Sequence, residues 1–73
     1  MDLIHAATMH NFPCIQTYIG NTDDETVARI MGRMFTEEII RCFLSIDTTR
    51  SRSILNQLGP NVQKAVRAEL TYL

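Results

Sequence analysis

Two adjacent acids, Glu37 and Glu38, are the first candidates for acid–base chemistry in this chain. Their spacing argues against it, because consecutive helical residues point about 100° apart and the two carboxylates cannot face one substrate. The sequence also lacks a serine or cysteine nucleophile elbow, a glycine-rich phosphate loop and an HExxH motif. We therefore predict that the protein is not an enzyme and has no small-molecule substrate.

Histidine and cysteine supply ligand types for a metal site at His5, His10, Cys14 and Cys42. On one helix, residues five apart diverge by about 140°, whereas zinc sites use closely paired ligands. We expect no metal and no other cofactor. The two histidines are predicted to be surface or partly packed residues, and both cysteines to be reduced core residues.

DNA recognition is the third chemistry that the residues suggest. The stretch from residue 35 to 58 has the pattern of two short helices with a break at 45–47, similar to the helix-turn-helix of bacterial repressors. The net charge of −1 argues against it, and Ser51 falls where a buried aliphatic residue is expected. A DNA-binding regulator remains the alternative function. The side chains that would contact base edges in the major groove are those of Thr48, Thr49, Arg50 and Arg52.

The apolar spacing along the chain predicts an all-α fold, a compact bundle of five or six short helices. We expect helices at about 2–10, 13–19, 23–34, 36–44, 48–58 and 60–72. The last four begin about a dozen residues apart, so that two helices would make a unit of about 25 residues, which is shorter than a typical armadillo or TPR unit.

Helix starts and ends are predicted from capping residues. Thr22 and Glu25 have capping-box spacing, and Thr36 and Asp47 are expected to cap the helices that follow them. Gly20 is expected to end its helix in the left-handed conformation. The favourable i,i+4 ion pairs would be Glu25 with Arg29 and Glu37 with Arg41.

A chain of 73 residues with only two cysteines predicts one domain with a small core. Such a core supplies about 3–5 kcal/mol, so we expect added stability from self-association or a partner. Residues 22–73 would form the core unit of a single domain, 1–73; the pattern leaves open how 1–20 pack. No basic leader follows Met1 and no apolar run approaches about 20 residues. These features predict a cytoplasmic protein without membrane insertion.

One pattern of apolar and acidic residues extends along most of the chain. Its features are Phe12, Asp23 and Asp24, Val27, Ile30, Met31 and Met34, Thr36 to Ile39, Ile54 to Leu58, and Glu69 with Leu70. In this pattern the chain is similar to the flagellar motor-switch proteins of the FliG family, in the armadillo-like segment that opens their C-terminal domain. The resemblance runs without gaps over about fifty residues, 26–73, and consists mainly of apolar spacing. The amino-terminal domain of the MgtE magnesium transporters has nearly the same spacing.

The resemblance implies a cytoplasmic scaffold whose units stack through apolar helix faces, while a later charged helix transmits torque. Glu69 matches an acidic position of the family near the end of this segment. Ala68 stands where an aspartate is usual, and Leu44 and Asn61 stand where basic residues are usual. The resemblance therefore implies stacking rather than torque.

The bulky apolar residues in the middle of the chain are either core or part of a docking face. We predict an assembly module that binds itself or a protein partner, with a homo-oligomer preferred. Besides the DNA-binding regulator, a small inhibitor that caps another protein is the other alternative. The interface candidates are Met31, Met34, Phe35, Phe43 and Glu69.

Overall fold

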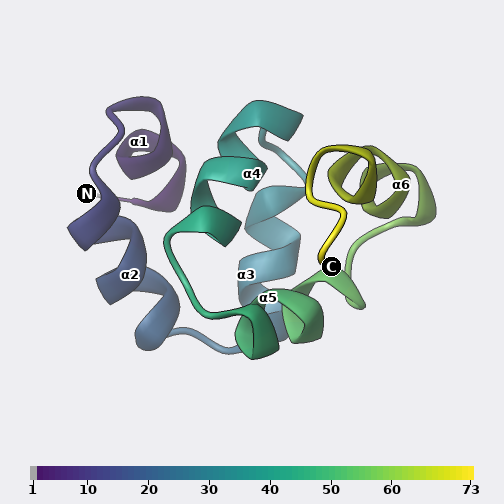
Figure 1. The fold of residues 1–73 in the computed structure, drawn as a ribbon. Helices are drawn as coiled ribbons and strands as arrows, with labels where there is room; N and C mark the ends of the chain where they lie inside the picture. Colours follow the sequence, from purple (N-terminus) through teal and green to yellow (C-terminus); the bar gives the residue numbers. More distant parts are fainter. Residues whose placement is uncertain (1) are drawn as a thin grey trace.

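The computed structural model describes residues 2–73, which form six α-helices joined by short turns (Figure 1). No strand occurs within these residues, so the predicted all-α fold is confirmed. The helices are α1 (Leu3–Thr8), α2 (Phe12–Gly20), α3 (Asp24–Met31), α4 (Thr36–Leu44), α5 (Thr48–Leu55) and α6 (Pro60–Glu69).

Four helices, α1, α3, α5 and α6, are shorter than the sequence predicted, and α3 and α6 show why. After α3, the N–H of Met34 bonds the carbonyl of Met31 at 3.0 Å, a tighter i→i+3 turn that ends the α-helical ladder three residues early. α6 ends at Glu69 instead of near 72, because Leu70 has φ −115° and ψ 79°, outside the helical region. The apolar pattern of the sequence continues past the C-terminal ends of α3 and α6, because side chains in the turns that follow these helices still point toward the core.

Local capping follows the sequence in part. Asp47 caps α5 as predicted, its Oδ1 accepting from the N–H of Arg50 at 2.7 Å. The capping role of Thr22 is wrong, since its hydroxyl donates back to the carbonyl of Tyr18 at 2.7 Å. The left-handed conformation predicted for Gly20 is also wrong, because no glycine within residues 2–73 has a positive φ.

The helices recur along the chain at an interval of 24 residues. α2 and α4 are offset by 24 at both ends, as are α3 and α5, and α6 begins 24 residues after α4. Burial follows the same interval, because equivalent positions of successive units are fully buried. Two such sets are Leu3, Val27 and Ser51, and Ala7, Met31 and Leu55.

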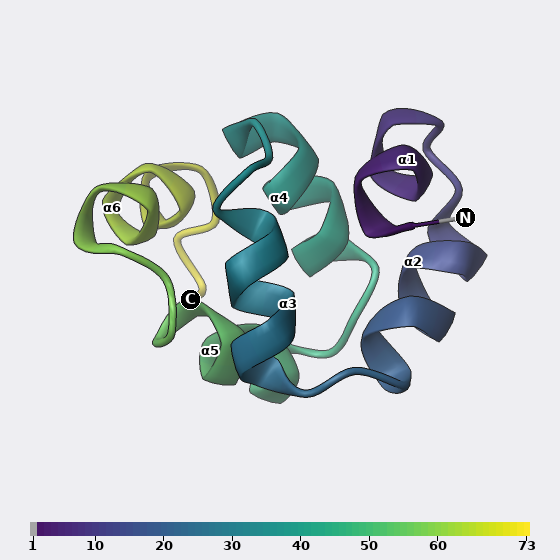
Figure 2. The ribbon, with the colours of Figure 1, turned by 180° about the vertical axis from the view of Figure 1, so that it is seen from behind.

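Contacts between helices follow this recurrence. Each of the first four helices contacts the helix two places further along the chain, and α1 also packs on α2 and α4. Figures 1 and 2 show α3 and α4 in the middle, with α1 and α2 on one side and α6 on the other. The middle pair is therefore flanked on both sides, whereas α1 with α2 and α6 lie at the two ends.

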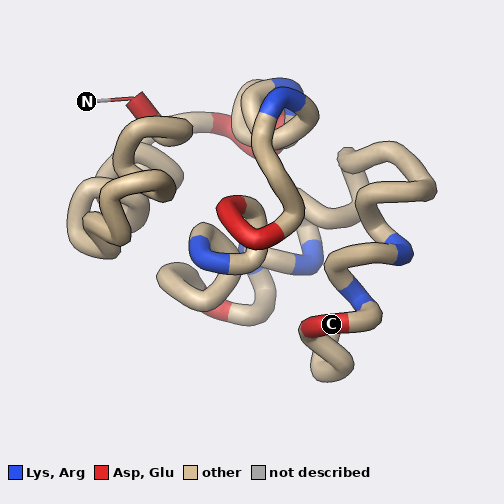
Figure 3. The backbone as a smooth tube through the Cα atoms, turned by 90° about the horizontal axis from the view of Figure 1, so that it is seen from above, with Lys and Arg blue, Asp and Glu red and all other residues tan. Residues whose placement is uncertain are grey.

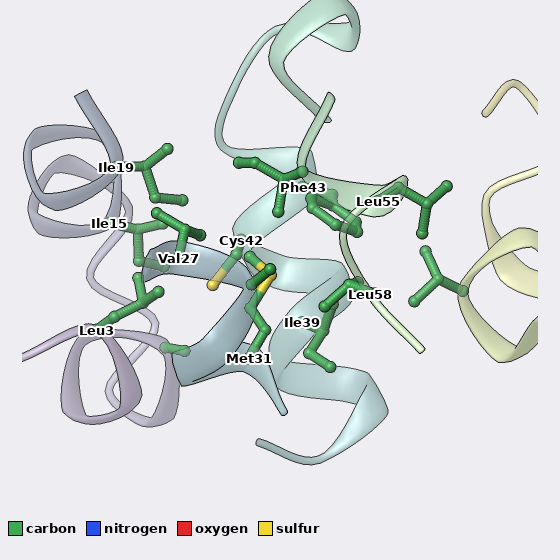
Figure 4. Packing of buried hydrophobic residues seen from close by; sticks show 14 of the residues in the cluster. Leu3, Ile15, Ile19, Val27, Met31, Ile39, Cys42, Phe43, Leu55 and Leu58 are labelled. Atoms are coloured by element: carbon green, nitrogen blue, oxygen red, sulfur yellow. The ribbon is translucent and has the colours of Figure 1, made fainter. Parts of the chain in front are cut away.

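One continuous core joins the units, and α1 and α2 contribute to it. Figure 4 shows Leu3, Ile15 and Ile19 on one side of the central α3 and α4 side chains, with Leu55 and Leu58 on the other. All five belong to the same buried cluster. The hydrophobic burial in this cluster is the main favourable term that holds short helices in place.

Candidate protein-interaction surface

The five predicted interface residues lie in different environments. Met31 and Phe43 are fully buried, because a six-helix core covers more apolar surface than a two-helix layer could. Met34 is half-buried against the core. Phe35 leaves 77% of its surface exposed, and Glu69 is exposed. The docking-face hypothesis is therefore restricted to Phe35, Glu69 and the surface near them.

Phe35 is held outside the core by the way α4 begins. It is the N-cap residue, with extended dihedrals of φ −71° and ψ 152°, so its side chain does not follow the helical periodicity. Its N–H donates to Oε1 of Glu38 at 3.0 Å. The predicted cap, Thr36, is instead the first helical residue, and Glu38 satisfies the free backbone group.

Glu38 also ties this helix start to α1. Its Oε2 accepts the hydroxyl proton of Thr8 at 2.6 Å, across thirty residues of sequence. The bond from Thr8, followed by that from the N–H of Phe35, holds the pKa of Glu38 below its ordinary value. One carboxylate thus fixes the end of α1 and the backbone of Phe35 together, which gives the exposed ring a rigid base.

An open groove of about 650 Å³ lies between α4 and α6, and Phe35 immediately precedes a residue that lines it. Its apolar members are half-buried Ile40 and Ala65, and exposed Ala68. The remaining lining residues are polar: Thr36, Glu37, Arg41 and Glu69. An apolar groove with a charged rim, next to an exposed aromatic ring, is the composition of a protein-binding surface.

Of the charged side chains around the groove, Arg41 bonds to the protein backbone, whereas the others make no ion pair within the described residues. The predicted pair of Glu37 with Arg41 does not form, because a guanidinium N–H of Arg41 donates to the carbonyl of Ala7 at 3.2 Å. Within residues 2–73, Glu37, Glu69 and the nearby Arg33 make no ion pair, and all three are exposed. Two acids on the rim and one base beside Phe35 are thus available to a partner.

Sequence reasoning missed the small residues of the groove. From the sequence, Ala68 is notable only because an aspartate is usual there, and nothing singles out Ala65. A signal existed in α4, since Glu37, Ile40 and Arg41 follow i, i+3, i+4 and line the groove together. Leu44, 61% exposed, was also missed.

Arg50, a predicted DNA reader, is instead part of the fold. Its Nε lies 2.5 Å from Oδ1 of Asp24, and another guanidinium N–H donates to the carbonyl of Ile19 at 2.9 Å. A third bond reaches the carbonyl of Thr22. These bonds use the donors of the guanidinium on protein groups, so the side chain cannot project into a groove of DNA without losing them.

The other DNA candidates do not form a basic surface. Thr48 and Thr49 are exposed in the first turn of α5, and Arg52 donates to the carbonyl of Tyr72 at 3.1 Å. Figure 3 shows basic and acidic residues interspersed along the described backbone rather than basic residues gathered on one side. A DNA-binding surface needs a basic concentration that this distribution does not provide.

A second open groove, of about 500 Å³, runs along α2. Half-buried Cys14 and Tyr18 line it together with Pro13, Thr17, Asn21 and Thr22. None of these side chains is charged, so this groove offers a partner apolar contact without an electrostatic determinant of orientation.

The cysteines and histidines do not assemble into a chemical site. Cys42 is fully buried and Cys14 half-buried, and both are free thiols. His5 and His10 are exposed. Across the described residues, no three histidine, cysteine or acidic side chains come together as a metal site would require. The same residues include no helix with the length and apolar character needed to cross a bilayer.

Comparisons with protein-family models, with curated proteins and with solved structures found no match to this chain.

Proposed function

We propose that this protein is a non-enzymatic assembly module that associates with further copies of itself through the surface around Phe35. The observation that carries the proposal is the 77% exposure of Phe35 beside an open groove. A phenylalanine is a large apolar residue that soluble monomers seldom leave exposed next to further apolar surface. The backbone N–H of Phe35 is bonded to Glu38, so the backbone beneath the ring loses little conformational entropy on binding.

The architecture supports a stacking role. The units recur at 24 residues, and α1 with α2 and α6 lie at the two ends. In repeat proteins, each unit buries its apolar face against a neighbouring unit. The end of the stack that has no neighbour is a natural place for another chain to bind. The stacking implied by the resemblance to the FliG family has this form. We extend the proposal to that scaffold role, without torque, in the reducing cytoplasm, where the two free thiols would persist.

The proposal is tested by measuring the solution mass by light scattering over a dilution of about 100-fold. We expect a dimer or larger species that dissociates on dilution. Phe35→Glu should abolish association, because it places a charge in the contact. Leu44→Glu is the matched control, since Leu44 is an apolar residue, 61% exposed, at the other end of α4 and outside the groove lining. A monomer at every concentration would refute the proposal.

A further inference from the structure

We infer that the groove between α4 and α6 is the receptor for Phe35 of a second copy, and that two copies exchange this ring reciprocally. This assignment rests on the proposed self-association and identifies the ring of the second copy as what the groove binds. The exposed ring and the groove share one part of the molecule, since Phe35 precedes Thr36, which lines the groove. Each copy therefore carries both halves of the contact side by side.

The groove is suited to an aromatic ring. Its volume of about 650 Å³ lies within the range of roughly 300–1,000 Å³ that accommodates small organic ligands. The methyl groups of Ala65 and Ala68 leave room between the helices, and Ile40 supplies a branched apolar surface. A phenyl ring against Ile40, Ala65 and Ala68 leaves the exposed carboxylates of Glu37 and Glu69 accessible to water, and Arg41 is bonded to the carbonyl of Ala7.

The charges favour a second copy as the occupant. Within residues 2–73, Arg33, two residues before Phe35, is exposed and makes no ion pair, and the groove acids Glu37 and Glu69 make none either. When the ring of one copy enters the groove of another, its Arg33 approaches these carboxylates. The guanidinium of Arg41 only partly repels the incoming Arg33, because it is turned toward the carbonyl of Ala7. Ring and base on one side thus complement groove and acids on the other.

Two-fold symmetry would limit the assembly to a closed dimer. In a two-fold contact, residue i meets residue j of the partner and residue j meets residue i. A ring and its receptor that lie next to each other satisfy this rule in a single pair of molecules. The expected species is a closed dimer with two equal Phe35–groove contacts rather than an open chain.

Two variants test the two halves of the contact separately. Phe35→Ala removes the ring, and Ala68→Trp fills the groove from an exposed helix position. Each should raise the dissociation constant by about 30-fold or more, the usual effect of losing a central aromatic contact. Leu44→Ala, outside the groove lining, should leave it unchanged. Ala68→Gln, a milder filling residue and a good helix former, replaces Ala68→Trp if circular dichroism shows that tryptophan disturbs the fold.

Mixing the two variants gives the decisive result. Phe35→Ala retains an intact groove and Ala68→Trp retains an intact ring, so an equimolar mixture restores one of the two contacts. We expect heterodimers in the mixture, weaker than the wild-type dimer but stronger than either variant alone. Light scattering with one variant labelled by a fluorophore measures this.

The outcomes separate the inference from the proposed function. A wild-type monomer at all concentrations overturns both. A wild-type dimer that is lost in Phe35→Ala but kept in Ala68→Trp overturns the reciprocal exchange and leaves assembly through Phe35 standing. Loss in both variants without recovery on mixing also overturns it, because the ring and groove would then serve different contacts. Recovery on mixing supports it.

Discussion

Arg50 Nε on α5 lies 2.5 Å from Oδ1 of Asp24 at the start of α3. Both side chains are about three-quarters buried, with 27% and 26% of their surfaces exposed. The second carboxylate oxygen of Asp24 accepts the hydroxyl proton of Ser53. The pair therefore joins two successive repeat units at their edges, and through Ile19 it also reaches the end of α2.

Arg50→Ala should destabilise the protein by about 1.5–3 kcal/mol, because it removes charge-assisted bonds and leaves partly buried acceptors without donors. The control is Arg29→Ala. Arg29 pairs with Glu25 at 3.3 Å, as predicted, but both side chains are about 70% exposed, so solvent screens the pair. Its loss should change the free energy of unfolding by less than about 0.5 kcal/mol. Urea unfolding of the two variants measures the difference, and equal effects would contradict the role assigned to Arg50.

The role of Arg50 shows where sequence reasoning stops. Helix existence, helix type and the break at 45–47 followed from apolar spacing and capping chemistry, which act within a few residues. The contact between Arg50 and Asp24 spans 26 residues and depends on how α5 lies against α3. An arginine in the first turns of a helix after a polar turn has the same local pattern whether it binds DNA or its own fold.

Acid should destabilise the protein through Asp24 and Glu38. The bond from Ser53, then that from Arg50, lowers the pKa of Asp24 below its ordinary 3.8, and Thr8 and Phe35 lower that of Glu38 below 4.5. A lowered pKa in the folded state stabilises it above the ordinary value, and this stability is lost as pH falls through the folded value. The free energy of unfolding should stay level from pH 7 to about 5 and fall steadily below that.

Single carboxylate variants assign this acid sensitivity. Asp24→Asn and Glu38→Gln should each lower stability at pH 7 and flatten the decline below pH 5. Glu37→Gln is the matched control, since Glu37 makes no hydrogen bond or ion pair within the described part of the chain. Urea unfolding at a series of pH values follows the decline. An unchanged decline in both test variants would show that other groups cause it.

The two phenylalanines near α4 should respond oppositely to truncation. Phe43 is fully buried, so Phe43→Ala should cost about 3–5 kcal/mol, as much as a small core supplies, and unfold the protein. Phe35→Ala should change the stability of the dilute monomer by less than about 0.5 kcal/mol. Circular dichroism in urea, at concentrations below association, measures both. A folded Phe43→Ala variant would contradict the packing described for α4.

The contrast between these residues could not be read from the sequence. Within α4, helical periodicity relates Ile39 to Phe43, and both are buried. Phe35 stands outside the helix at its N-cap, where no periodicity applies, and its exposure depends on the turn that follows α3. The groove beside it needs the position of α6 against α4, which is set by packing across the whole domain.

The thiols should differ strongly in reactivity. Burial, with a smaller effect from the charge of Glu38, raises the pKa of Cys42 to about 12. At pH 8 only about one in ten thousand Cys42 side chains would then be the reactive thiolate, and the core shields that fraction. Iodoacetamide should therefore modify Cys14, which borders the open groove on α2, and leave Cys42 unmodified until urea unfolds the protein. Mass spectrometry counts the adducts, and Cys14→Ser should remove the fast one. Fast labelling of Cys42 in folded Cys14→Ser would mean that the centre of the core opens far more often than its complete burial indicates.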